Sequence, residues 1–154
     1  MAELSYPFES QNTGTAAEPV YDRAITAENE RTFNKLRYTN GVFSSVGNGL
    51  SVSSNNNMTV TVGTGGAHVE GALYYNSVPI NLAVEAANAS LNRIDRVVLQ
   101  FNTSVSVRSV RVLIRTGTAA TNPVAPELRQ ESNLYEIALA DVYVGKGKTS
   151  IEQS

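Results

Sequence analysis

The stretch Arg93–Thr116 reads RIDRVVLQFNTSVSVRSVRVLIRT, and its pattern decides the fold. Two runs rich in β-branched and large apolar residues, Ile94–Phe101 and Val107–Ile114, flank a polar turn at residues 102–104. Because successive side chains of a strand point to opposite faces, each run has one apolar face and one mixed face. The stretch therefore predicts the central β-hairpin of an antiparallel sheet, with the mixed face in contact with solvent.

The register of this hairpin follows from its apolar face. A turn centred on residues 104–105 pairs Val97 with Val112. It also pairs Leu99 with Val110, so that all four apolar side chains share one face. A slip of one residue would replace the two valines of the second run by arginines, so burial selects the register.

Length and composition limit the class of protein. The chain has 154 residues, which is enough for one domain with a hydrophobic core. Apolar residues make up 42% of the chain and charged residues only 17%, and the net charge of −2 is scattered without a basic face. We therefore expect a globular domain that does not bind nucleic acid.

Missing residue types exclude several kinds of chemistry. Without cysteine the chain forms neither disulfides nor thiolate metal sites, and it lacks a cysteine nucleophile. Its first residues do not show the basic and apolar regions of a secretory signal, and no apolar run approaches the ~18 residues that span a bilayer. We expect no membrane partner and no cofactor.

The chain divides into an arm and one domain. Residues 1–20 form the predicted N-terminal arm, whose aromatic residues Tyr6 and Phe8 could dock on the sheet or on a partner. Residues 21–154 form the predicted β-sandwich domain, which includes a short helix near residues 26–38.

The helix is predicted from its end signals. Thr26 is a suitable N-cap, and Glu28 and Glu30 place carboxylates in the first turn, where they suit the helix dipole. Asn40–Gly41 supplies a residue that can adopt positive φ, and we expect the helix to stop there. The helix is short and polar, so it needs the sheet for stability.

Beyond Gly41 short runs of alternating residues are separated by turn signals. Ala67–Tyr75 reads as one strand in which Gly71 indicates a bulge or a close backbone approach. Gly117–Pro126 reads as an extended crossing loop, and Lys148–Ile151 as a last strand. The sequence therefore predicts a mainly β protein, a single antiparallel β-sandwich of about eight strands with one short N-terminal helix.

Two motifs are candidates for catalytic or ligand sites. Gly147, Lys148 and Thr149 match part of a phosphate-binding loop, but Val142 stands where that loop needs a glycine, so we favour a hairpin turn. His68 is the only histidine. We favour a surface or rim histidine over a metal ligand, because catalytic zinc sites usually take three protein ligands. We expect no catalytic residue.

Asp95 is the most informative polar residue. It falls on the apolar face of the predicted hairpin, in line with Val97 and Leu99. A carboxylate in that position must be paired or hydrogen-bonded to remain charged. Arg93, on the same face, and Arg23, before the helix, are the candidate partners. We favour a structural ion pair over a catalytic acid.

Tyr74 and Tyr75 form the one aromatic cluster. Adjacent strand residues point to opposite faces, so we expect one tyrosine in the core and the other in solvent. The exposed tyrosine is a candidate contact for a partner subunit or a glycan.

Several stretches occur together in an order that resembles a known family. They are Tyr6-Pro7-Phe8, Tyr21-Asp22-Arg23-Ala24, Asn40-Gly41-Val42-Phe43, Gly71-Ala72-Leu73-Tyr74-Tyr75, Arg93-Ile94-Asp95-Arg96-Val97-Val98-Leu99, Gly117-Thr118-Ala119-Ala120 with Asn122-Pro123 and Pro126, and Leu134-Tyr135-Glu136-Ile137-Ala138-Leu139-Ala140. This series resembles a module of tail-tip and baseplate proteins of long-tailed phages that infect Gram-positive bacteria. It is also similar to the N-terminal shoulder β-sandwich of lactococcal phage receptor-binding proteins.

The resemblance implies a non-enzymatic structural or accessory protein, an adaptor or decoration module whose partners are phage tail or baseplate proteins. It also implies a place in the tail region of the virion, or in the host cytoplasm during assembly, and a possible homo-oligomer. Relatives continue into a neck and a receptor-binding head, whereas this sequence ends at Ser154, which favours the adaptor role. The alternatives are a small carbohydrate-binding module that recognises host cell-wall glycans through Tyr74 or Tyr75, and, less favoured, a hydrolase that uses His68.

Overall fold

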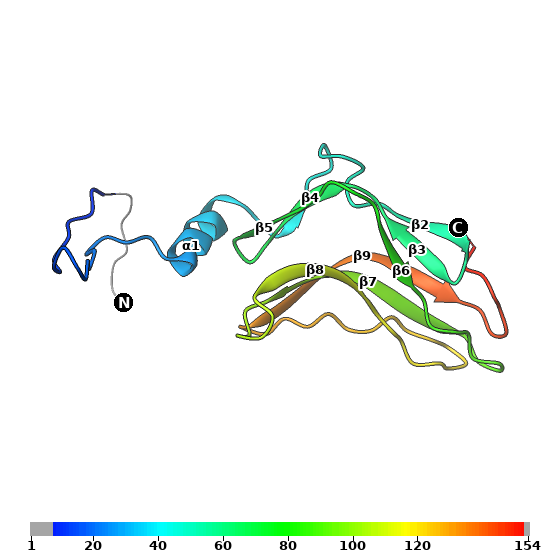
Figure 1. Ribbon diagram of the computed structural model, residues 1–154. Helices are drawn as coiled ribbons and strands as arrows, with labels where there is room; N and C mark the ends of the chain where they lie inside the picture. The colour runs from blue at the N-terminus through cyan, green and yellow to red at the C-terminus, as the bar shows by residue number, and fades with distance from the viewer. Residues whose placement is uncertain (1–7, 153–154) are drawn as a thin grey trace.

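The predicted hairpin forms the centre of one sheet in the computed structural model, which describes residues 8–152 (Figure 1). Strand β7 (Arg93–Asn102) pairs antiparallel with β8 (Ser109–Arg115) on one side and with β9 (Leu134–Val144) on the other. The long strand β7 therefore occupies the middle of the lower layer in Figure 1.

The predicted pairing in this hairpin is wrong by two residues. Val97 lies opposite Ile114 and Leu99 opposite Val112. The connection between the strands is longer than predicted, and Arg108 within it adopts a positive φ of 40°. Because side chains alternate with a period of two, a shift of two keeps every residue on its predicted face. Val97 and Leu99 are accordingly fully buried.

The other layer is a bent ribbon of two sheets, ordered β2-β3-β6 and β1-β4-β5. Its strands are β1 (Gly41–Val42), β2 (Val52–Asn57), β3 (Thr59–Val62), β4 (Gly65–Val69), β5 (Ala72–Asn76) and β6 (Ile80–Ala83). Val62 lies opposite Ile80, and Gly65 lies opposite Asn76. At the joint between the two sheets, two residues on one side therefore face three on the other, which is a one-residue bulge.

The hydrophobic core lies between the two layers (Figure 1). Both layers contribute fully buried side chains, among them Val62 and Val69 from the ribbon and Val97 and Leu99 from β7. Within residues 8–152 the chain has nine strands in three antiparallel sheets and one helix. The mainly β, antiparallel class predicted from the sequence is confirmed.

Two strand predictions are wrong. The stretch Ala67–Tyr75 is a hairpin rather than one strand, because Glu70 and Gly71 both adopt positive φ, 50° and 78°, and reverse the chain. Lys148–Ile151 forms no strand. The close backbone approach predicted at Gly71 is confirmed, since a Cβ atom there would lie 2.1 Å from the carbonyl oxygen of Arg31.

Helix α1 (Ala27–Arg37) begins as predicted and ends earlier than predicted. The Thr26 hydroxyl accepts a hydrogen bond from the backbone N–H of Asn29 at 3.1 Å, so the N-cap is confirmed. Tyr38 is already extended, with φ of −130°, and Gly41 belongs to β1. The prediction that Asn40–Gly41 stops the helix is therefore wrong.

The mixed face of the β8-β7-β9 sheet is partly covered, although the sequence predicted contact with solvent. Residues 117–133 run along this face (Figure 1), and Arg96 of β7 donates a hydrogen bond to the Pro126 carbonyl at 2.8 Å. Val98 and Glu136 on this face are fully buried. An extended loop thus takes the place of a third layer.

Candidate interaction surface

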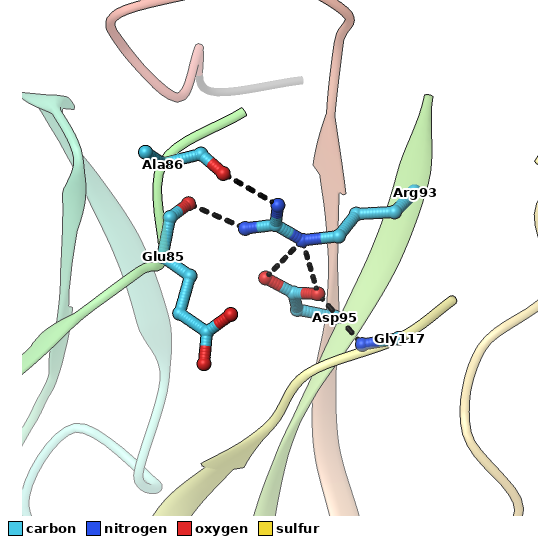
Figure 2. A network of polar contacts seen from close by, with 5 residues as sticks. All are labelled: Glu85, Ala86, Arg93, Asp95 and Gly117. Carbon is cyan, nitrogen blue, oxygen red and sulfur yellow. Dashed lines mark hydrogen bonds and ion pairs between the residues drawn. The ribbon is translucent and has the colours of Figure 1, made fainter. Parts of the chain in front are cut away.

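Asp95 and Arg93 form a buried ion pair (Figure 2). The Arg93 Nε atom lies 2.9 Å and 3.2 Å from the two carboxylate oxygens of Asp95, and the Asp95 side chain is fully buried. The backbone N–H of Gly117 donates to the same carboxylate at 2.8 Å. The remaining guanidinium nitrogens of Arg93 donate to the carbonyls of Ala86, at 2.7 Å, and Glu85.

These contacts tie three segments together: the loop before β7, β7 itself and the loop after β8. Each charged group of the pair has hydrogen-bond partners, which offset the large desolvation cost of a buried charge. The geometry favours the structural role expected for Arg93 and Asp95. Arg23 does not join them, because its guanidinium lies over the Phe8 ring at 5.7 Å in the N-terminal segment.

Glu136 is a second buried carboxylate, and the residue pattern alone did not predict its position. It accepts hydrogen bonds from Gln100 (2.7 Å), Arg115 (2.8 Å) and the backbone N–H of Arg129 (2.9 Å). Burial alone would raise the pKa of Glu136, but these hydrogen bonds and the Arg115 charge lower it below its ordinary value. Glu136 lies opposite Gln100 in the β7–β9 pairing. The contact between them could therefore be predicted only with knowledge of the β7–β9 register.

Helix α1 meets the ribbon at the β4–β5 turn. The Asn34 amide donates to the Gly71 carbonyl at 3.2 Å, and Lys35 forms an ion pair with Glu70. The Asn40 amide donates to the Glu70 carboxylate at 2.8 Å. This small set of polar contacts joins α1 to the sheet, and α1 itself has no buried residue.

His68 lies beside this junction and is buried rather than at the rim, so the expected surface position is wrong. The Tyr38 ring lies 5.3 Å from the His68 ring, and neither imidazole nitrogen has a hydrogen-bond partner within residues 8–152. Burial lowers the pKa of His68, and the nearby Glu70 carboxylate opposes that shift. No group of three metal-ligating side chains occurs among the same residues.

The outer face of β4 and β5 carries exposed apolar side chains. Tyr74 and Tyr75 point to opposite sides: Tyr74 packs against the core, and Tyr75 is 67% exposed. Leu73, on the same side as Tyr75, is 68% exposed, and its cross-strand neighbour is His68. Tyr38 stands over His68 and is 54% exposed. We call Tyr38, Leu73 and Tyr75 the outer patch.

The N-terminal segment forms a small hairpin, which we call the arm hairpin (residues 10–23). The Thr13 N–H donates to the Val20 carbonyl at 2.7 Å, and Asn12 and Tyr21 form an antiparallel bridge. Every residue from 8 to 26 is exposed, so the exposed arm extends six residues beyond the predicted boundary at residue 20. Tyr6 lies outside the described residues, so its predicted docking is not addressed by the structure.

The arm hairpin holds apolar side chains in solvent. Those more than half exposed in and beside it are Phe8, Val20, Tyr21 and Ile25. Figure 1 shows the arm projecting from the N-terminal end of α1, away from both layers. Neither this hairpin nor the outer patch was singled out as a surface by the residue pattern alone, although Tyr75 was.

A cleft lies between β2 and β9. It has a volume of about 470 Å³ and is bordered by Val52 and Ser54 on one side and by Val142 and Tyr143 on the other. Lys148 of the GKT segment lines it but forms an ion pair with Glu152 at 3.2 Å. Gly147 adopts positive φ in a turn, so this segment has the conformation predicted for a turn rather than a phosphate-binding loop.

Comparisons with family models, with curated proteins and with solved structures found no match to this chain. Within residues 8–152 no helix is long and apolar enough to cross a bilayer. The case for function therefore rests on the surfaces described above and on the order of the sequence stretches.

Proposed function

We propose that this chain is a non-enzymatic structural or accessory protein of a bacteriophage, an adaptor or decoration module of the tail or baseplate that acts through protein–protein contacts. The sequence resemblance supports the kind of assembly. The observation that carries the mode of action is the arm hairpin, which presents apolar side chains at the end of a helix that has no buried residue.

The physical reason is the cost of leaving such an element uncovered. A lone two-stranded hairpin is only marginally stable in water, and it gains free energy when its apolar side chains are removed from solvent. Val20, Tyr21 and Ile25 lie in or beside this hairpin and are all more than half exposed. An arm of this kind is suited to contact with another subunit. The buried ion pair of β7, in contrast, holds loops of the same chain together.

Incorporation into the particle tests the proposal. We expect the full-length chain to co-purify with phage particles by mass spectrometry and to be immunolabelled at the tail region, or in the host cytoplasm during assembly. A Val20→Ser/Tyr21→Ser variant should be depleted from particles, while a Val105→Ser/Val124→Ser control, changed at apolar residues exposed elsewhere, should be retained. Absence of the wild-type chain from particles and assembly intermediates contradicts the proposal.

A second candidate function is the carbohydrate-binding module. It is favoured by one observation, that Tyr75 and Tyr38 expose their rings on the same outer face. A glycan array or a host cell-wall pull-down should then give a signal that Tyr75→Ala removes. No signal with the wild-type chain would discard this function and leave the adaptor role standing.

A further inference from the structure

Two apolar surfaces are left exposed by residues 8–152, and they lie at opposite ends of α1. The arm hairpin precedes the helix, and the outer patch begins with Tyr38, immediately after it. A helix of eleven residues is about 16 Å long. Figure 1 shows the arm beyond the end of α1 that is farther from β4 and β5. With α1 between them, the arm does not lie on the patch of its own chain.

The charges on the two surfaces are complementary. The arm, residues 8–26, carries three carboxylates and one cation: Glu9, Glu18, Asp22 and Arg23. The second half of α1, residues 31–37, carries three cations and no carboxylate: Arg31, Lys35 and Arg37. Lys35 is paired with Glu70, and Arg37 lies directly before Tyr38 of the outer patch. Because Glu70 neutralises Lys35 and the Arg31 guanidinium lies over the Phe101 ring of β7, Arg37 is the cation beside the patch that the acidic arm can meet.

The outer patch also contains an unusual buried group. His68 lies between Tyr38 and Leu73 with both imidazole nitrogens lacking partners among the described residues. Both nitrogens are already shielded from water, and this burial lowers the pKa of His68 and so favours the neutral imidazole.

From these observations we infer that the arm hairpin of one copy docks on the outer patch of a second copy. The apolar side chains of the arm cover Tyr38, Leu73 and Tyr75, and its carboxylates lie near the cationic half of α1. In a two-fold dimer the contact occurs twice, from the arm of each copy to the patch of the other, and the assembly closes with two copies. The inference rests on the proposed function in one respect, because it names a second copy as the first partner of an assembly module.

Light scattering of the purified full-length chain tests the association. We expect a mass above the 16.5 kDa of one chain, falling towards that value on dilution. Two variants separate the surfaces: Val20→Ser/Tyr21→Ser alters the arm, and Leu73→Ser/Tyr75→Ser alters the patch. Each should weaken association at least about tenfold, as expected for loss of aromatic anchors. The control Val105→Ser/Val124→Ser should associate like wild type, and circular dichroism melting curves establish that all variants fold.

A mixing experiment identifies which surface meets which. Neither variant alone retains a complete arm-and-patch contact, but a mixed dimer retains one, formed by the intact arm of one chain and the intact patch of the other. We therefore expect equal amounts of the two variants to associate more tightly than either does alone. A wild-type chain that is monomeric at all concentrations overturns the inference, and so does a patch variant that associates normally.

The inference and the proposed function fail separately. Self-association is measured on the purified chain without phage components, whereas the adaptor role is measured by incorporation into particles. A monomeric chain that is incorporated overturns only the inference. A chain that associates but is absent from particles and assembly intermediates overturns only the phage role.

Discussion

The two halves of this molecule use polar and apolar residues in opposite ways. In the β7 region, Asp95, Arg93 and Glu136 are buried, and apart from the Arg93–Asp95 pair within β7 their contacts hold one segment of the chain to another. At the α1 end, apolar residues such as Tyr21 and Leu73 stand in solvent. The difference shows that buried charge holds segments of this chain together, and it is the basis on which we propose the exposed apolar surface at the α1 end as the part that meets partners.

The largest expected effect comes from breaking the buried pair. Asp95→Ala leaves the Arg93 charge buried without its partner and should reduce the free energy of unfolding by about 3–5 kcal/mol. Asp141→Ala is the matched control, because the Arg96–Asp141 pair is partly exposed and should be worth less than about 1 kcal/mol. Urea unfolding measures the free energy of unfolding of both variants. Equal decreases for the two would contradict the proposed contrast between buried and surface charge.

Glu136 should give the next largest effect. Glu136→Ala leaves its donors in the covered face without an acceptor, at a cost of about 2–3 kcal/mol. The native pKa of Glu136 lies below its unfolded value, so its contribution is present above the unfolded pKa and is lost as the pH falls through the native pKa. Urea unfolding of wild type between pH 7 and pH 3 should show this loss. The variant should show a smaller decrease over the same range.

Gly71→Ala tests the joint between the two halves. Its φ of 78° disfavours a side chain, and the added Cβ would collide with the Arg31 carbonyl, so α1 must move away from the turn. We expect a loss of about 1–2 kcal/mol, with faster amide exchange in α1 and unchanged exchange in β7. Gly41→Ala, where a Cβ meets nothing within 4 Å, should change stability by less than about 0.5 kcal/mol.

The smallest expected effect belongs to His68. Its native pKa lies below the unfolded value of 6.5 because it is buried, so folding is favoured by the neutral imidazole. Stability from this group is complete above pH 6.5 and declines as the pH falls from there towards the native pKa. A His68→Phe variant should melt with a weaker dependence on pH between 7 and 5. An identical pH dependence in both proteins would refute the assignment.

From the sequence we could predict which side chains of β7 face the core, but not where the chain reverses direction. Val97 and Leu99 could be placed on the buried face because burial selects between the two sides of a strand. The turn containing Arg108 and the reversal at Glu70 could not be read, because neither residue type normally signals positive φ. Thr26 was readable because an N-cap depends on its immediate neighbours alone.

In the candidate sites, too, contacts between neighbouring residues could be predicted and contacts between distant segments could not. Arg93 and Asp95 are two residues apart on one strand, so their pairing could be predicted locally. The Gly117 N–H and the carbonyls of Glu85 and Ala86 come from other segments and depend on tertiary structure. Hydrogen bonds between polar groups of the arm hairpin hold it together, and its sequence has no apolar periodicity from which it could be predicted.

The bulge where the ribbon bends has a further consequence for how this chain tolerates change in length. The Val62 and Ala67 side chains both point inward although five steps, an odd number, separate them, and the extra residue on the opposite side absorbs the mismatch. Deleting a single residue from 77–79 would turn that hairpin inside out, moving Tyr75 inward and Tyr74 into water. Removing two would preserve the original sides, so natural variation at this corner should come in even steps.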